Sequence, residues 1–335
     1  MAAKKILYIG NKLANLGRTP TSADILPGLF EKEGYVVYSF SVKENKILRL
    51  LDMLKSVLVL SNKVDWIIID VYSTQNFWYA YLCGKLSKAK GVHYINILHG
   101  GNLERRLRKN FLSFFHNAKY NIAPSEFFYS KFSAVGLTNL KFIPNSIKLD
   151  EYNFKERHQF GPKIIWVRSF AEIYNPLLAI QLLELLVQKY GKSALYMVGP
   201  DKDGSLLKCK NYAEKNKLPV HFKGKLDKKI WHKLAEECDI FLNTSTLDNT
   251  PVSIVEAMAL GLPVLSSKVG GIPYLIEDGK DGILFESNNL KDLADKTFKL
   301  LDKQLDANTI AKNARKKVEK FDWENVKDQW NDLLT

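Results

Sequence analysis

The feature that most constrains the fold is an alternation of short apolar runs with helix-length segments, which occurs twice along the 335 residues. Expected strands of the first half lie at 5–10, 35–41, 65–71, 93–98, 120–123 and 141–144. Those of the second half lie at 163–167, 194–198, 220–223, 239–243, 263–266 and 282–285. Strands that alternate with helices predict a parallel, doubly wound sheet, so we expect an α/β chain with two such sheets.

The length and one polar stretch suggest where the chain divides. A chain of 335 residues is about twice a typical domain. Residues 148–161 are polar and charged with little periodicity, which is typical of a linker. We therefore expect one Rossmann-like domain over 1–150, a second over 161–318, and a last helix over 319–335.

Charge is distributed unevenly between the two halves. Residues 1–160 hold 23 Lys and Arg against 12 Asp and Glu, whereas the remainder holds 26 against 24. A basic half indicates an anionic surface or substrate. No common nucleic-acid recognition motif is present, so nucleic acid is not the expected partner. The basic amphipathic segments 43–63 and 103–119 favour an anionic membrane surface, although the aromatics of the second could instead be core.

Other features bear on the compartment. Cys83, Cys209 and Cys238 are widely spaced and form no metal or disulfide pattern. The first residues run directly into an expected strand, so we expect no signal peptide, and no apolar run reaches the length of a membrane span. We expect a cytoplasmic protein, with peripheral attachment to the inner face of the cell membrane left open.

The most informative motif is Asp-Asn-Thr-Pro-Val-Ser-Ile-Val-Glu-Ala-Met-Ala-Leu-Gly-Leu-Pro-Val at 248–264, followed by Val-Gly-Gly-Ile-Pro at 269–273. Thr250 suits a helix N-cap, Pro251 the first helical position and Gly261 the stop. Backbone N–H groups and the positive dipole end then favour a phosphate. The candidate binding residues are Asn249, Thr250, Pro251, Val252 and Ser253. An ordinary capped core helix is the alternative interpretation.

Two carboxylates flank this helix start, Asp248 and, eight residues on, Glu256. Together with the glycine and proline pattern, they resemble the Glu-x7-Glu signature of retaining GT-B glycosyltransferases of the family 4 type (glycosyl transferases group 1). The first acid of that signature is Asp here. The resemblance is strong over 161–290 and looser over 1–147. It implies a GT-B fold, in which two Rossmann-like domains face each other across a cleft and the C-terminal helix crosses back to the N-terminal domain.

The resemblance also implies roles for particular residues. Arg168, after an expected strand, would bind the donor diphosphate with two bonds. Glu256 would accept bonds from the ribose hydroxyls, and Asp248 would contact hydroxyls of the donor sugar. His99, followed by two glycines at the end of another strand, would contact the transferred sugar, with a purely local loop role as the alternative.

Two further groups of residues follow from the same resemblance. Gly17 and Arg18, in the loop after the first strand, would line the cleft, although a solvated Arg18 is equally compatible. The family's diphosphate lysine is missing after Arg168, so Lys225 or Lys202 would replace it. Asp201 and Asp203 match an Asp-x-Asp metal motif, but they lie in a turn where acids are common, and we expect no metal.

The resulting expectation is a retaining hexosyltransferase that uses a UDP- or GDP-sugar. Its acceptor would be a glycan or a lipid-linked glycan in cell-surface polysaccharide synthesis, with the first domain on the acceptor side and the second binding the donor. No tightly bound cofactor is expected. A GT-B sugar-nucleotide epimerase and a non-catalytic sugar-nucleotide-binding protein are the alternatives. The base, the sugar, the acceptor and the oligomeric state stay open.

Overall fold

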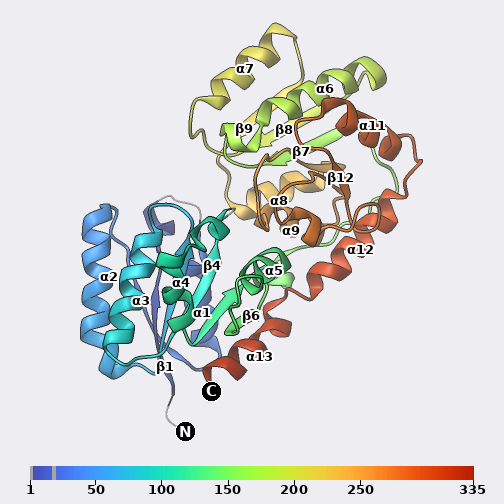
Figure 1. The fold of residues 1–335 in the computed structure, drawn as a ribbon. Coiled ribbons are helices and arrows are strands. Elements are labelled where there is room, and N and C mark those ends of the chain that lie inside the picture. Colours follow the sequence, from blue (N-terminus) through green and yellow to red (C-terminus); the bar gives the residue numbers. More distant parts are fainter. Residues whose placement is uncertain (1–2, 17–19, 101) are drawn as a thin grey trace. The chain divides into compact units, whose positions relative to one another are not determined.

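The computed structural model describes residues 3–16, 20–100 and 102–335 (Figure 1). The chain forms two compact units. The first contains Met1–Pro144 together with Lys327–Thr335, and the second contains Asn145–Val326. Each unit contains a six-stranded sheet. The prediction of two doubly wound parallel sheets is therefore confirmed.

The sheet of the first unit is built from strands that are all parallel to their neighbours, in the order β2-β1-β3-β4-β5-β6. The strands are β1 (Lys5–Ile9), β2 (Val36–Phe40), β3 (Trp66–Tyr72), β4 (Tyr94–His99), β5 (Tyr120–Ala123) and β6 (Leu140–Phe142). The helices are α1 (Ser22–Lys32), α2 (Lys46–Leu60), α3 (Phe77–Ala89), α4 (Lys109–Asn117) and α5 (Glu126–Ser133). The strand order reverses between β1 and β3, and ligands of open parallel sheets bind at the carboxyl ends of strands at such a point.

The C-terminal helix α13 (Trp323–Leu334) ends within the first unit. The ring of Trp330 packs edge-on against Phe30, with the ring centroids 5.4 Å apart. The indole Nε1 of Trp66 donates to the carbonyl oxygen of Leu334 at 2.9 Å. A large aromatic therefore anchors the end of the chain on the first unit.

The sheet of the second unit is also wholly parallel, in the order β12-β11-β10-β7-β8-β9. Its strands are β7 (Lys163–Val167), β8 (Ala194–Val198), β9 (Val220–Gly224), β10 (Ile240–Asn243), β11 (Val264–Ser267) and β12 (Ile283–Phe285). Its helices are α6 (Pro176–Tyr190), α7 (Ser205–Lys215), α8 (Lys228–Glu236), α9 (Val252–Ala259), α10 (Ile272–Leu275), α11 (Leu290–Leu301) and α12 (Ala307–Glu319). Here the order reverses between β7 and β10.

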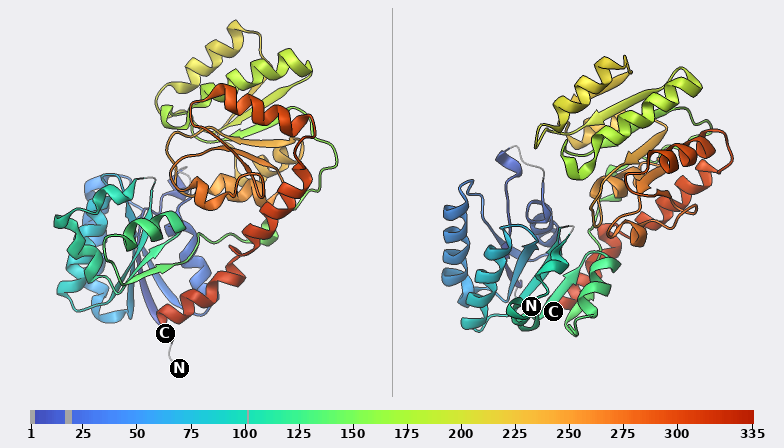
Figure 2. Two further views of the ribbon diagram at one scale, coloured as in Figure 1. Left: turned by 45° about the vertical axis from the view of Figure 1, so that its right-hand side comes forward. Right: turned by 45° about the horizontal axis from the view of Figure 1, so that its top comes forward.

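Helices cover both faces of this second sheet (Figure 2). One hydrophobic cluster joins the sheet to α6, α7 and α11, and another joins it to α8, α9 and α12. Apolar side chains of a strand alternate between the two clusters: Ile164 and Trp166 belong to the first, and Ile165 to the second. A parallel strand buried on both faces needs the continuous apolar run that the sequence shows.

The stretch 148–161 is not a free linker, which corrects the sequence prediction. Tyr152 and Arg157 are both buried. The Arg157 guanidinium donates to the carbonyl oxygens of Cys238, Ala235 and Gly261 at 2.9 Å each. Backbone carbonyls of the second unit thus satisfy a buried cation, so a polar composition did not mean exposure here.

The segment 103–119 is likewise not one helix. A 3-10 turn, η3 (Leu103–Arg106), precedes α4, and the extended backbone of Arg108 separates the two. Phe114 and Phe115 are buried in the core of the first unit, so these aromatics do not form an exposed apolar face. The alternative interpretation of the aromatics, as core residues, holds for these two.

All three cysteines are buried and unpaired. Burial raises the pKa of the Cys83, Cys209 and Cys238 thiols to about 12 in each case. Among the described residues, no helix has both the length and the apolarity of a membrane span.

Candidate functional site

The helix that carries the most informative motif begins one residue later than predicted. Pro251, and not Thr250, is the N-cap of α9, and Val252 is its first residue. Val252, one of the candidate binding residues, is exposed. The hydroxyls of Thr250 and Ser253 are buried and have no hydrogen-bond partner. Gly261 follows the helix end with φ +78°, as the predicted stop requires.

Arg168 and Asp248 come together beside this helix start. Arg168 directly follows β7 and Asp248 lies in the loop after β10, so both lie at the carboxyl ends of the strands where the order reverses. The Arg168 guanidinium contacts the Asp248 carboxylate and lies over the Tyr174 ring, 4.7 Å from its centroid. Its Nε has no hydrogen-bond partner, and burial lowers the pKa of Arg168. A buried guanidinium with an unused donor is suited to an oxyanion.

The Gly-Gly-Ile-Pro motif holds the Asp248 loop in place. The Gly271 N–H donates to the Asp248 carbonyl oxygen at 3.0 Å. Gly270 has φ +53°, and a Cβ there would overlap that same oxygen. The Ser245 hydroxyl donates to the Asp248 carboxylate at 3.2 Å. The two glycines therefore permit a backbone contact that orients one of the predicted acids.

Glu256 is buried on α9 and receives two donors on the same oxygen. The Lys228 ammonium lies 2.6 Å from Glu256 Oε1, and the Tyr152 hydroxyl donates to it at 3.0 Å. The His232 ring packs on Tyr152, with centroids 4.8 Å apart. Burial, followed by the Glu256 charge, raises the pKa of Tyr152. The other carboxylate oxygen, Oε2, forms no hydrogen bond within the described part of the chain and can accept one from a ligand.

Lys228 and Tyr152 were not predicted as site residues. Tyr152 lay in the stretch assigned to the linker, and Lys228 is one of four lysines in residues 223–229. Lys202 and Lys225, the predicted substitutes for the missing diphosphate lysine, are both exposed. A tyrosine within an otherwise polar segment was the available signal for Tyr152.

Asp201 and Asp203 have local structural partners. Asp201 accepts from the Gly204 N–H at 3.1 Å, and Asp203 accepts from the N–H groups of Ser205 at 3.1 Å and Glu172 at 2.8 Å. The hydrogen bond from the Ser205 hydroxyl lowers the pKa of Asp203. Across the described ranges, no group of three or more His, Cys, Asp or Glu side chains is arranged to hold a metal ion.

In the first unit, the predicted His99 belongs to a buried polar cluster at the carboxyl ends of β3 and β4. Its Nε2 lies 3.0 Å from Asp70 Oδ1, which also accepts from the Tyr8 hydroxyl at 2.8 Å. The Tyr72 ring stacks on the His99 ring, with centroids 4.9 Å apart and planes at 23°. Asp70 was not predicted, although an acid within the apolar run Asp-Trp-Ile-Ile-Ile-Asp-Val was a signal for it.

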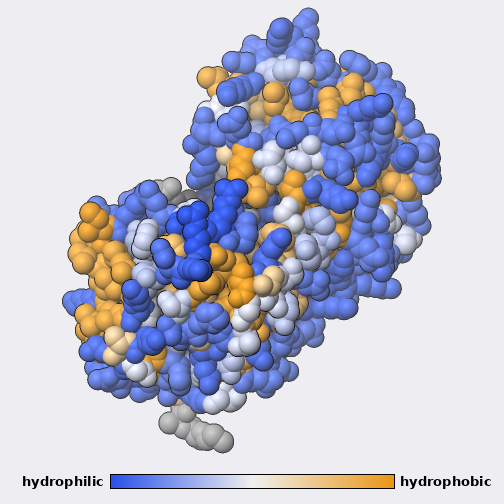
Figure 3. All heavy atoms as spheres, in the orientation of Figure 1, coloured by the Kyte–Doolittle hydropathy of each residue, from blue (hydrophilic) through white to orange (hydrophobic). Residues whose placement is uncertain are grey.

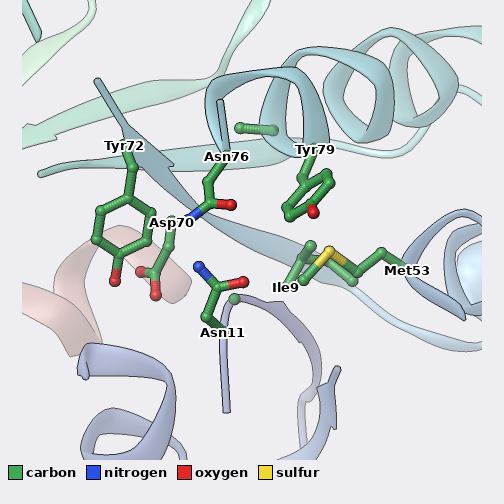
Figure 4. A pocket seen from close by; sticks show the side chains of 9 residues that line it. Ile9, Asn11, Met53, Asp70, Tyr72, Asn76 and Tyr79 are labelled. Atoms are coloured by element: carbon green, nitrogen blue, oxygen red, sulfur yellow. The ribbon is translucent and has the colours of Figure 1, made fainter. Parts of the chain in front are cut away.

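A small cavity adjoins Asp70, and Figure 4 shows Asn11, Asn76 and Tyr72 around it. Its volume of about 10 Å³ is roughly what a single water occupies. Asp70 Oδ2 is buried without a hydrogen-bond partner, and a Cβ on Gly10 would overlap it. The predicted residues Gly17 and Arg18 lie outside the described residues.

The two wholly parallel six-stranded sheets are those of the GT-B glycosyltransferase class, as the solved structures that superpose on the chain indicate. HepE from Anabaena, solved in complex with UDP and glucose, superposes with a TM-score of 0.75 at 21% identity, covering 99% of both chains. Sucrose-phosphate synthase from Thermosynechococcus elongatus superposes with a TM-score of 0.78 at 14% identity, covering 98% of both chains. At 21% and 14% identity, these similarities show that the fold is shared and nothing more.

The chain also belongs to a sequence family of glycosyltransferases. The model for glycosyl transferases group 1 matches residues 150–317, and the chain belongs to that family. The amylovoran biosynthesis glycosyltransferase AmsK of Erwinia amylovora is 26% identical over 294 residues, covering 80% of this chain and 70% of AmsK. The sulfoquinovosyl transferase SQD2 of Arabidopsis thaliana is 30% identical over 150 residues, which cover 43% of this chain and 28% of that protein. Some curated relatives are thus matched over only about a third of their length.

Proposed function

We propose that this protein transfers a sugar, with retention of anomeric configuration, from a UDP- or GDP-sugar to a glycan or lipid-linked acceptor in cell-surface polysaccharide synthesis. The observation that carries the proposal is the pair formed by Arg168 and the start of α9. Arg168 Nε and the hydroxyls of Thr250 and Ser253 are buried polar groups without partners. Buried donors without partners are costly, and a diphosphate would satisfy them.

The arrangement fits the charge that develops during transfer. As the bond between the sugar and the diphosphate breaks, negative charge grows on the leaving oxygen. A fixed guanidinium and the N–H groups at the start of α9 stabilise that charge without reorganisation. Glu256 Oε2 accepts from the ribose, and Asp248 binds a sugar hydroxyl. UDP is the first nucleotide to test, because HepE was solved with it.

The test is calorimetry of the wild type with UDP, GDP, ADP and CDP, repeated with Arg168→Ala and Glu256→Ala. Lys210→Ala, a substitution of an exposed residue on α7, controls for the loss of one positive charge. One nucleotide should bind, and both site variants should weaken it at least tenfold. If no nucleotide binds, or if the variants bind it like the wild type, the site is wrong. Sugar transfer to an acceptor, as opposed to interconversion of the free sugar nucleotide, then separates a transferase from an epimerase.

We further propose that α2 attaches the protein to an anionic membrane on its cytoplasmic side. Ile47, Leu48 and Leu51 are 70%, 55% and 56% exposed, and Figure 3 shows an apolar patch over this helix. Lys46 and Lys55 on the same helix are exposed as well. Apolar residues bordered by lysines match a surface with acyl chains below anionic headgroups.

Vesicle flotation tests this attachment. Vesicles with phosphatidylglycerol should bind the wild type, and vesicles of phosphatidylcholine alone should bind it weakly. Leu51→Glu should abolish flotation. Leu207→Glu, at a residue of the second unit that is 63% exposed, should not change it. Equal flotation of both variants would exclude α2 as the attachment site.

A further inference from the structure

The first unit contains a hollow that the donor site does not use. It is lined by Ser73, Asn102, Arg105, Arg106, Arg108 and Phe111, and its volume is about 190 Å³. That volume holds several waters and has room for one phosphate or a diphosphate. In Figure 3 the most hydrophilic residues of this face gather over η3 and the start of α4.

Arg106 is held in place within this hollow. Its Nη2 donates to the Ser73 carbonyl oxygen at 3.2 Å, and its guanidinium lies over the Phe77 ring, 4.8 Å from the centroid. Arg105 and Arg108 flank it and are exposed. One half-buried arginine is thus preorganised, which lowers the entropic cost of binding an anion, and two exposed arginines lie beside it.

The charge of the hollow is not neutralised from within. In the described parts of the chain, none of the three guanidiniums forms an ion pair with a carboxylate. Residues 102–109 contain the three arginines and Lys109 but only one acid, Glu104. The segment therefore has a net charge of +3. The N-terminus of α4, beginning at Lys109, adds its dipole and backbone N–H groups.

We propose that this hollow binds a phosphate or diphosphate group of the acceptor, which rests on the proposed glycosyl transfer. The donor diphosphate is assigned to Arg168 and α9 in the second unit, so a second phosphate site in the first unit is suited to the other substrate. A guanidinium group binds two phosphate oxygens at once. A solvated cluster of surface charges, in contrast, explains neither the hollow nor the fixed position of Arg106. The acceptor is therefore an anionic, phosphate-bearing glycan or lipid carrier.

The experiment is a calorimetric titration of the full chain with inorganic pyrophosphate at 150 mM salt, with UDP saturating the donor site. Arg105→Ser/Arg108→Ser should weaken pyrophosphate binding at least tenfold and leave UDP binding unchanged. Lys63→Ser/Lys90→Ser removes two exposed charges of the same unit outside the hollow and should change pyrophosphate binding less than twofold. Melting temperatures of both double variants establish that they fold.

Three results would overturn the proposal. The wild type could bind no pyrophosphate, the arginine variant could bind it unchanged, or both double variants could weaken it equally, which would indicate net charge alone. A separate measurement compares the binding of the wild type and of the arginine variant to phosphatidylglycerol vesicles. If the arginine variant loses vesicle binding but keeps pyrophosphate binding, the arginines contact a membrane surface and the phosphate site is excluded. If none of UDP, GDP, ADP and CDP binds in the control titrations, the proposed function is overturned instead.

Discussion

The carboxylate of Asp70 binds His99 Nε2 at 3.0 Å and thereby orients the imidazole at the carboxyl end of β4. An anionic acceptor at Nε2 favours the tautomer with the proton on that nitrogen, which leaves Nδ1 as an acceptor. The stacked Tyr72 ring restricts the same imidazole from its face. Asp70 is thus a positioning residue: it orients His99, which is the predicted contact to the substrate.

Asp70→Asn should lower the turnover rate of sugar transfer by at least tenfold and leave nucleotide affinity unchanged. The substitution replaces a charged hydrogen bond, which contributes about 1.5–3 kcal/mol, with a neutral one. Tyr8→Phe removes the other donor to Asp70 and keeps the contact with His99, so its turnover should stay within about threefold of the wild type. Steady-state kinetics with nucleotide calorimetry would decide, and unchanged turnover in Asp70→Asn would remove Asp70 from the mechanism.

Lys228→Met should reduce discrimination between UDP and 2′-deoxy-UDP. Lys228 places N–H donors beside Glu256, whose Oε2 is available as an acceptor. A donor next to an acceptor suits a ribose hydroxyl, which can use both. UDP affinity should fall about tenfold and 2′-deoxy-UDP affinity much less. The neighbouring exposed Lys229→Met is the matched control, and equal losses for the two nucleotides would mean that Lys228 acts only through charge.

Asp248→Asn should separate nucleotide affinity from transfer. The Asp248 carboxylate occupies the Arg168 guanidinium, so neutralising it frees that charge for a diphosphate. We expect UDP affinity to rise about fivefold, which corresponds to about 1 kcal/mol for a partly exposed ion pair. The rate of sugar transfer should fall, because the donor sugar loses its contact with the Asp248 carboxylate. Weaker UDP binding in calorimetry would show that Asp248 orients Arg168 instead of competing for it.

The sequence predicted the fold well because it depends on local pattern. Every expected strand is present, since a buried parallel strand must be a continuous apolar run. Arg168 and Asp248 follow β7 and β10 at the carboxyl end of the second sheet, the edge that a strand followed by a polar residue indicates, and their roles in binding stay predictions.

What the sequence did not predict depends on contacts across long separations. Tyr152 reaches Glu256 over 104 residues, and Asp70 reaches His99 over 29. The helix start at Val252 was displaced because Pro251 has an extended backbone, with ψ 120°, that no composition rule fixes. Arg157 lies in the stretch predicted to be a linker, and its burial depends on carbonyl groups about 80 to 100 residues further along the chain.

Acid should destabilise the second unit through His232. Burial, with a smaller contribution from the Lys228 charge, lowers the pKa of His232 to about 4, and its Nε2 is buried without a partner. The unfolded chain takes up this proton near pH 6.5, before the folded chain does, so stability contributed by the neutral ring is present above pH 6.5 and lost as the pH falls towards 4. His232→Gln should therefore lose less stability than the wild type between pH 7 and pH 4.5 in urea unfolding. His158→Gln, at an exposed histidine, should lose as much unfolding free energy as the wild type over the same pH range.

Gly270→Ala should disrupt the site more than the left-handed backbone alone explains. Gly270 and Gly279 both have positive φ, +53° and +77°, which costs an alanine about 1–2 kcal/mol. A Cβ on Gly279 meets open space, whereas one on Gly270 overlaps the Asp248 carbonyl oxygen, so the loop that carries Asp248 must move. Gly279→Ala should lower stability by that amount and bind UDP normally. Gly270→Ala should be less stable still and lose UDP affinity, and equal behaviour of the two variants in urea unfolding and calorimetry would show that the Asp248 loop tolerates the displacement.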